Sequence, residues 1–133
     1  MPDVTLEQAT AIIERGRAHA AEMGLNAVFS ILDRGANPVA FARMDDAWLA
    51  SNDLAVAKAR TAVMFRMPSE DLAAPVAVGE PYPHFDHVPG GGLILMGGGL
   101  PLVDGEGRLL GGLGVSGGTP DQDAALARVA RGD

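Results

Sequence analysis

The fold is decided by the stretch Leu109-Leu110-Gly111-Gly112-Leu113-Gly114-Val115-Ser116-Gly117-Gly118-Thr119-Pro120-Asp121-Gln122-Asp123. Its first half is apolar and rich in glycine, which is typical of a strand that other elements cover closely. Its second half predicts the start of a helix, because Thr119 suits the N-cap and Pro120 the first helical position. Gln122 lies three residues after Thr119 and completes a capping box. The stretch therefore predicts a buried strand that turns sharply into a capped helix.

The turn between this strand and this helix is a candidate ligand site. It contains Ser116, Gly117 and Gly118, whose backbone N–H groups would be free to bind an anion or a carboxylate at the helix start. The alternative is that the glycines only permit a tight corner and that Asp121 and Asp123 only cap the helix. The two aspartates also place negative charge beside the site, which weakens its attraction for anions. Both interpretations remain open from the sequence.

The rest of the chain predicts an α+β fold, with about five antiparallel strands flanked by helices. Helices are expected after a capping box at Thr5-Leu6-Glu7-Gln8, from Ser51 to about residue 65, and from Pro120 to about residue 130. A short helical piece is expected over 69–76. Strands are expected over 27–32, 39–44, 93–96, 100–103 and 108–115. The strand over 100–103 contains Pro101 and is expected at an edge of the sheet. We expect one domain, residues 1–133.

Composition excludes several classes of protein. The net charge of −7 argues against a general nucleic-acid or anionic-membrane binder. The absence of cysteine excludes disulfides and metal sites that need thiolates. No apolar run approaches the ~18 residues that a membrane helix needs, and the N-terminus has no basic stretch leading into an apolar one. We therefore expect a cytoplasmic protein without membrane spans.

The loop over residues 78–92 carries a second candidate site. His84 and His87 could bind a divalent metal with Glu80 or Asp86 as a carboxylate ligand, act in acid–base chemistry, or ligate haem iron. Tyr82 and Phe85 would add aromatic faces for a flat ligand. The alternative is that both histidines are merely solvated. A third histidine, His19, falls at the edge of the first helix's apolar face, where it is either structural or an interface or haem-ligand residue.

Two cations complete the candidate residues. Lys58 is the only lysine in the chain, and helical spacing places it near the apolar side of its helix. A partly buried lysine can act as a base or form a Schiff base, or it can pair with Asp45 or Asp53. Arg43 ends the second strand, where it can clamp a ligand carboxylate or pair with a neighbouring aspartate.

Four segments, in order, resemble the GlcG/HbpS family of small haem-binding proteins, a fold that also forms the C-terminal domain of PduO-type corrinoid adenosyltransferases. They are residues 39–45 (VAFARMD), 57–68 with Ala57-Lys58-Ala59-Arg60-Thr61-Ala62, Phe65 and Pro68, 97–101 (GGGLP) and 111–123 (GGLGVSGGTPDQD). The resemblance implies a profilin-like or roadblock-like sheet, assembly into a homo-oligomer, haem binding as in several members, and proximity to catabolic functions. It does not imply adenosyltransferase activity, and the sequence has no P-loop pattern.

The leading hypothesis is a small cytoplasmic protein that binds haem or a related flat, carboxylate-bearing ligand, with a link to a catabolic pathway. The candidate ligand-binding residues are Arg43, Lys58, Tyr82, His84, Phe85, His87, Ser116, Gly117 and Gly118. The alternative is a small catabolic enzyme without an organic cofactor that uses His84, His87 and Lys58 for proton transfer, with or without a divalent metal on His84, His87 and Glu80. A third hypothesis is a subunit that assembles with a partner enzyme.

Overall fold

A four-stranded antiparallel sheet with the order β2-β1-β4-β3 forms the centre of the molecule. The structure is a computed structural model that describes residues 2–83, 87 and 92–133. The strands are β1 (Val28–Asp33), β2 (Pro38–Arg43), β3 (Gly99–Val103) and β4 (Leu109–Ser116). β1 and β4 are the central pair, and they contribute most of the buried strand residues. Pro101 lies on β3, which is an edge strand as its proline predicts.

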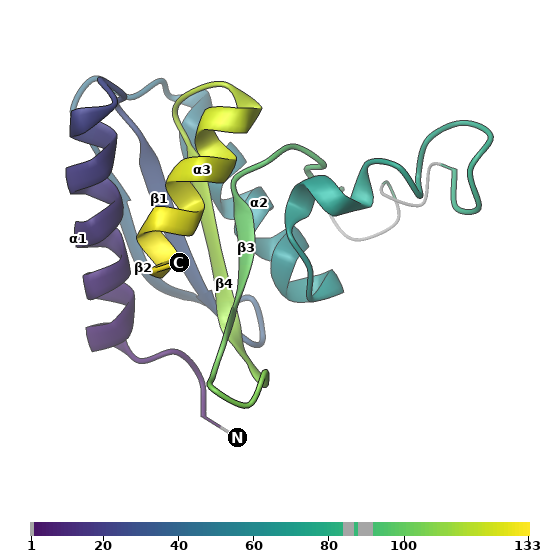
Figure 1. Ribbon diagram of the computed structural model, residues 1–133, viewed down its shortest axis with the longest axis horizontal. Coiled ribbons are helices and arrows are strands. Elements are labelled where there is room, and N and C mark those ends of the chain that lie inside the picture. The colour runs from purple at the N-terminus through teal and green to yellow at the C-terminus, as the bar shows by residue number, and fades with distance from the viewer. Residues whose placement is uncertain (1, 84–86, 88–91) are drawn as a thin grey trace.

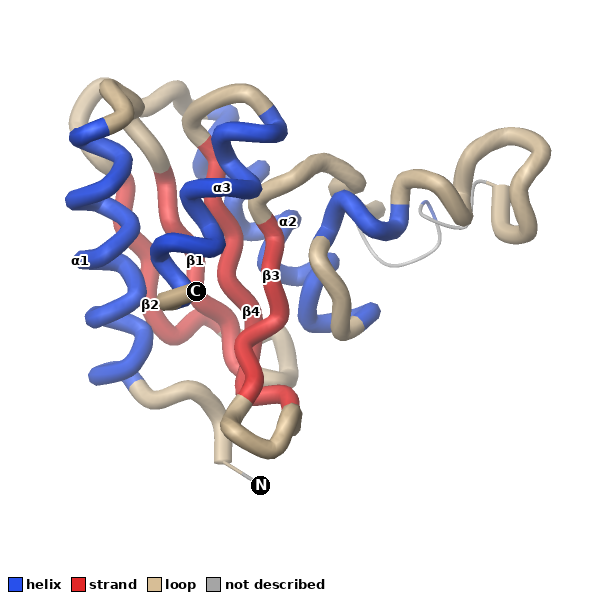
Figure 2. Tube along the Cα trace, viewed as in Figure 1, coloured by secondary structure: helices blue, strands red, loops and turns tan. Residues whose placement is uncertain are grey.

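Helices cover both faces of this sheet (Figures 1 and 2). α1 (Leu6–Glu22) and α3 (Pro120–Arg131) lie side by side on one face, over a core that includes Phe29, Leu113 and Val115. α2 (Ala50–Phe65) lies on the other face. The two faces differ because residues alternate along β4, so that Leu113 and Val115 point to α1 and α3 while Gly112 and Gly114 point to α2.

The glycines of β4 set the distance between α2 and the sheet. A β-carbon on Gly114 would overlap the carbonyl oxygen of Ala55, and one on Gly112 would press on the carbonyl oxygen of Ala59. The alanine-rich side of α2 therefore packs directly on the strand backbone. This explains why the stretch that decides the fold is glycine-rich and why the facing helix has small residues.

Both predicted capping boxes are present. The hydroxyl of Thr5 accepts a hydrogen bond from the N–H of Gln8 at 3.0 Å, and the side chain of Gln8 accepts one from the N–H of Thr5 at 2.9 Å. Thr119 and Gln122 form the same pair of bonds at the start of α3, at 3.2 and 2.9 Å. Within the part of the chain that the structure describes, no helix is long and apolar enough to cross a membrane.

Three sequence expectations about the elements differ from the structure. The apolar run over 93–96 is not a fifth strand, since its backbone bonds side chains instead of a neighbouring strand. The N–H of Ile94 donates to Thr61 Oγ1 at 3.1 Å, and Ser69 Oγ donates to the carbonyl of Met96 at 2.6 Å. Ser51 does not cap α2, which begins one residue earlier without a side-chain cap. The short helical piece is a single 3-10 turn, η1 (Ser69–Leu72).

Candidate functional site

The turn between β4 and α3 is occupied by a side chain of the protein itself. Asp123 Oδ1 accepts hydrogen bonds from the N–H groups of Gly117 and Gly118, at 3.1 and 2.8 Å. Ser116 ends β4 and is 4% exposed. The expectation that these N–H groups are free to face a ligand is therefore wrong, because an internal carboxylate already takes the place of the anion.

Lys58 bonds the other oxygen of the same carboxylate. Its Nζ lies 2.9 Å from Asp123 Oδ2 and donates to the carbonyl of Val115 at 3.0 Å. Both side chains are almost completely buried, at 2% and 3% exposure. The predicted partners, Asp45 or Asp53, are not the ones it uses. The helix positions Lys58 toward the sheet, where Gly98, at a φ of +123°, leaves room for its side chain.

This buried pair connects α2, β4 and the first turn of α3. Two charges taken out of water need each other and their hydrogen bonds to compensate for lost hydration. Lys58 therefore acts as a connection between elements, and none of the described surface hollows has it in its lining. The acid–base alternative, which needs Lys58 beside a substrate, finds no support in this geometry.

Beside the turn between β4 and α3, which we call the glycine corner, a hollow of about 540 Å³ opens to the surface. We call it the Trp48 hollow, because the indole of Trp48 stands at its edge with 82% of its surface exposed. Such exposure is unusual for the largest aromatic side chain. The lining comes from four separate segments: Gly24, Leu25, Asn26, Asp46, Trp48, Ser51, Leu54, Ser116, Gly117, Gly118, Thr119 and Gln122.

A second hollow, of about 300 Å³, adjoins the first through a shared residue, Asn26. We call it the Arg43 hollow; Arg17, Asn26, Arg43, Met44 and Asp45 line it. Arg17 pairs with Glu14 at 2.9 Å. Within the described residues, the Arg43 guanidinium has no hydrogen-bond or ion-pair partner. The predicted pairing of Arg43 with a neighbouring aspartate is therefore not formed, and its guanidinium is available to a ligand.

The histidine loop is described only in part. His84, Phe85 and Asp86, which the sequence analysis singled out, lie outside the described residues. Tyr82 is 61% exposed, on a segment that extends away from the sheet and helices (Figure 1). Among residues 2–83, 87 and 92–133, no three His, Asp or Glu side chains group closely enough to hold a metal ion. His19 is half-buried on α1, with Nδ1 3.4 Å from Glu22 Oε2.

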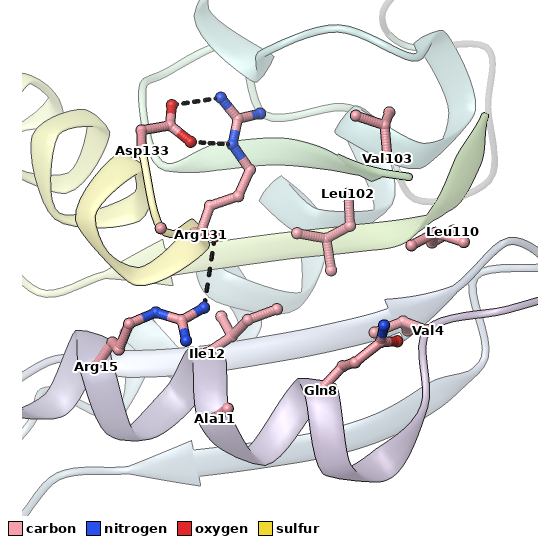
Figure 3. A pocket seen from close by; sticks show the side chains of 11 residues that line it. Val4, Gln8, Ala11, Ile12, Arg15, Leu102, Val103, Leu110, Arg131 and Asp133 are labelled. Carbon is pink, nitrogen blue, oxygen red and sulfur yellow. Dashed lines mark hydrogen bonds and ion pairs between the residues drawn. The ribbon is translucent and has the colours of Figure 1, made fainter. Parts of the chain in front are cut away.

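A third hollow, of about 560 Å³, lies between α1, the end of α3 and the edge of the sheet (Figure 3). Its arginines are held by the protein itself. Arg15 donates to the carbonyls of Ala130 and Arg131, at 3.0 and 3.4 Å. Arg131 binds both carboxylate oxygens of Asp133, at 2.8 and 2.6 Å, and the carbonyl of Pro101 at 3.2 Å. These bonds tie the end of α3 to α1 and β3, and they explain the arginines structurally.

Sequence reasoning named residues from both hollows, Arg43 in one and Ser116, Gly117 and Gly118 in the other, but it missed Trp48 and Asn26. Each hollow is assembled from segments far apart in the chain, so spacing within one motif does not reveal it. One signal was available, since the sequence contains a single tryptophan and it lies in a connection between elements. A tryptophan outside a helix or strand is a natural candidate for ligand contact.

Comparison with known proteins finds relatives along nearly the whole chain. A protein of 15.0 kDa from the dhaT–dhaS intergenic region of Citrobacter freundii is 35% identical over 127 residues, which are 96% of this chain and 89% of that protein. The corrinoid adenosyltransferase PduO of the same organism is 38% identical over 111 residues. That match covers 84% of this chain but only 33% of PduO, so the chain corresponds to about a third of that enzyme.

Solved structures with the same fold include three instructive examples. ORFY from Klebsiella pneumoniae has a TM-score of 0.94 and 32% identity, covering 98% of this chain and 90% of that one. The PduOC–haem complex has a TM-score of 0.90 and 29% identity, covering 97% and 93%. HbpS has a TM-score of 0.88 and 30% identity, covering 98% and 89%.

The family model described as "Haem degrading protein HbpS-like" matches residues 4–131. The four segments quoted from the sequence all fall inside this range. The resemblance inferred from those segments is thereby confirmed, and this chain belongs to the HbpS-like family.

Proposed function

We propose that this protein binds haem or a related flat, carboxylate-bearing ligand. The observation that carries the proposal is the match to PduOC, which was solved as a haem complex and shares the fold over 97% of this chain at 29% identity. The family description, which names a haem-degrading protein, supports the same ligand class.

The Trp48 hollow and the Arg43 hollow together have the chemistry that such a ligand needs. Trp48 and Leu25 offer an exposed aromatic face and an aliphatic surface for a flat ring. Arg43, in the adjoining hollow, offers a guanidinium group for a carboxylate, whereas Arg17 in the same lining is paired with Glu14. We place the ring beside Trp48 and the carboxylates toward Arg43, with Asn26 between the two.

The glycine corner is a poor alternative for the carboxylates. The N–H groups of Gly117 and Gly118 already bind Asp123, and the N–H of Thr119 binds Gln122. Asp46 adds another negative charge to the lining. A second carboxylate would meet repulsion there and few open donors.

Haem iron takes an imidazole as an axial ligand, and this chain has three histidines, His19, His84 and His87. The imidazole of any of the three could serve as the axial nitrogen ligand. When bound, haem would supply redox and oxygen chemistry, while the protein residues would position the ring and its carboxylates.

Titration with hemin, followed by visible absorption, tests this proposal. We expect a saturable shift of the Soret band that one of the variants His19→Ala, His84→Ala or His87→Ala abolishes. We expect Arg43→Ala and Trp48→Ala each to weaken binding about tenfold, which corresponds to about 1.4 kcal/mol.

Two matched variants serve as controls for this titration. Arg66→Ala removes an exposed arginine elsewhere, and Leu6→Ala removes an exposed apolar side chain at the start of α1. Both should bind hemin like the parent protein. No saturable Soret shift in the parent would refute haem binding, and equal losses in the controls would refute the placement at Trp48 and Arg43.

The more specific predictions from the sequence are still predictions. A cytoplasmic location, a link to a catabolic pathway, and a divalent metal on the histidine loop are predictions that the fold and the relatives do not test. The homo-oligomer implied by the family resemblance also stays a prediction.

A further inference from the structure

Three arginines line one hollow that the proposed ligand site does not use. The hollow has a volume of about 500 Å³, and we call it the arginine hollow. Its lining consists of Arg34, Arg66, Pro101, Val103, Gly107, Arg108 and Leu109. No aspartate or glutamate belongs to this described lining, although the chain as a whole carries a net charge of −7. Positive charge is therefore gathered at one place on an acidic protein.

The three arginines come from three different elements. Arg34 lies in the β1–β2 turn, Arg108 in the β3–β4 turn and Arg66 at the C-cap of α2. The strand register brings both turns to the same end of the sheet, because the last residues of β1 pair near the start of β4. Pro101 pairs with Gly112, whose missing side chain faces α2. The hollow therefore lies on the α2 face of the sheet, beyond the end of that helix.

Acidic residues outside the lining orient two of these guanidinium groups. Arg34 Nε donates to Asp3 Oδ1 at 3.0 Å. Arg108 Nε donates to Asp104 Oδ2 at 2.8 Å, and its Nη2 lies 3.3 Å from Glu106 Oε2. These bonds hold the guanidinium groups in place before a ligand arrives, which lowers the entropy that binding costs. They also neutralise part of the positive charge, so the attraction for an anion depends mostly on the third arginine.

That third arginine, Arg66, is held in an unfavourable backbone conformation. It is the left-handed C-cap of α2, with a φ of +55° and a ψ of +39°. Glycine adopts this conformation without strain and is the usual residue at such a helix end. Within the described residues, the Arg66 guanidinium has no hydrogen-bond or ion-pair partner, so it does not cap the carbonyls of the helix. Helix stability therefore does not explain an arginine here, and backbone strain of this kind is typical of functional positions.

A phosphate group has the chemistry that this arrangement fits. It carries nearly two negative charges at pH 7, and its three terminal oxygens are strong hydrogen-bond acceptors. Guanidinium groups bind such oxygens in pairs, and three of them that approach from three elements match a tetrahedral group better than a planar carboxylate. Pro101, Val103 and Leu109 add an apolar wall. A hollow of about 500 Å³ also has room for a small organic group beside the phosphate.

We propose that the arginine hollow binds the phosphate group of a small phosphate monoester, and that Arg66 is its principal ligand-binding residue. The hollow shares no lining residue with the Trp48 hollow or the Arg43 hollow. Binding of haem and binding of the ester are therefore independent, and either can fail without the other. Arg66→Ala separates them, because it should bind hemin like the parent protein and lose the ester.

Calorimetric titration with phenyl phosphate, at constant ionic strength, tests this site. Arg66→Ala should raise the dissociation constant at least tenfold. Arg66→Lys should raise it by a smaller factor, because lysine keeps the charge but lacks the two-pronged geometry. Arg60→Ala is the matched control: it removes the same charge from the same helix, lies outside the lining, and should bind like the parent.

Two further titrations identify the part of the ligand that is recognised. Benzoate has the same ring with a planar carboxylate and should bind more weakly than phenyl phosphate. Inorganic phosphate lacks the ring, and binding as tight as that of phenyl phosphate would overturn the ester in favour of free phosphate. No binding of phenyl phosphate by the parent at up to about 10 mM, or an equal loss in Arg60→Ala, would refute the site.

The variant Arg66→Gly distinguishes a ligand-binding role from a structural one. It removes the guanidinium and relieves the backbone strain, so its thermal unfolding midpoint without ligand should be at least as high as that of the parent. Phenyl phosphate should raise the midpoint of the parent and of Arg60→Ala, but not that of Arg66→Gly. A variant that unfolds at a lower temperature than the parent and still responds to phenyl phosphate would show that Arg66 is structural, and it would overturn the proposal.

Discussion

At the scale of single residues, Asp123 is the buried carboxylate that connects the β4–α3 turn to α2. One carboxylate binds two backbone N–H groups of the corner and the ammonium group of Lys58. The sequence predicted its position in the first turn of a helix, but not its partner, which lies 65 positions away along the chain. Local patterns reveal helix caps, whereas a pair of this kind depends on how α2 and α3 meet across the sheet.

We predict that Asp123→Asn strongly destabilises the protein. The amide still accepts hydrogen bonds from the corner, but Lys58 loses its counter-charge while it remains buried. Loss of one partner of a buried ion pair costs about 3–5 kcal/mol. Urea denaturation at neutral pH measures the change in the free energy of unfolding, and a loss below about 1 kcal/mol would contradict this role.

A double-mutant cycle separates the pair from the capping bonds. Lys58→Met removes the charge with little change in volume, and it leaves Asp123 bound to the corner N–H groups. The double variant Lys58→Met/Asp123→Asn should cost clearly less than the sum of the two single losses, because no unpaired charge remains. Additive losses would show that the two residues act separately.

At the scale of elements, the two hairpin turns are built alike. Asp33 Oδ1 accepts hydrogen bonds from the N–H groups two and four positions later, and Asp104 Oδ1 does the same, all at 2.9 Å. The fourth residue of each turn has a positive φ. It is Gly107 in the β3–β4 turn, at +80°, and Ala36 in the β1–β2 turn, at +63°. Only the first of these is a residue that adopts this conformation without strain.

We predict that Ala36→Gly stabilises the protein by about 0.5–1 kcal/mol. The strain of a side chain in the left-handed region, about 1–2 kcal/mol, exceeds the entropy that glycine adds to the unfolded chain. Gly107→Ala should destabilise by a similar amount. Gly105→Ala is the matched control, because Gly105 lacks a positive φ and nothing lies within 4 Å of its added β-carbon. Thermal unfolding compares the three, and a lower midpoint for Ala36→Gly would contradict the prediction.

The helices, strands and turns of this fold differ in how well the sequence predicts them. Capping boxes, hairpins and the edge position of Pro101 were predicted because their signals are local. The run over 93–96 was misread as a strand, because an apolar segment is buried equally well by packing against a helix. Its backbone is satisfied by Thr61 and Ser69, which are more than 25 positions away, and no local pattern announces such partners.

At the scale of the whole molecule, the sequence indicated a class of ligand but not the place where the candidate residues come together. The sequence indicated a flat, carboxylate-bearing ligand, and Arg43 stays among its candidate residues. Lys58, Gly117 and Gly118 were chosen for groups that the folded chain uses internally. Trp48 was missed because its neighbours in the hollow come from the turn after α1, from α2 and from the corner.

Near the chain ends and in the β3–β4 turn, aspartate carboxylates accept hydrogen bonds from arginines. The protonation of these carboxylates affects how the stability of the protein responds to acid. Bonds from Arg34 hold the pKa of Asp3 below its ordinary value, first through a backbone hydrogen bond. Bonds from Arg108 do the same for the pKa of Asp104, again chiefly through the backbone N–H. The side chain of Arg131 lowers the pKa of Asp133. Each of these groups is therefore more acidic in the folded chain than in the unfolded one.

We predict that the free energy of unfolding is constant above about pH 5 and falls as the pH drops below about 4, where ordinary aspartate titrates. The sign follows from the lowered pKa values: in this range the unfolded chain binds protons that the folded chain still excludes, so protonation favours unfolding. Urea denaturation at pH 7, 5, 4 and 3 measures the slope. Asp104→Asn should be less stable than the parent at pH 7 and lose less on acidification, because this residue no longer titrates. A parent protein equally stable at pH 7 and pH 3 would show that these arginine–aspartate bonds contribute nothing to the free energy of unfolding.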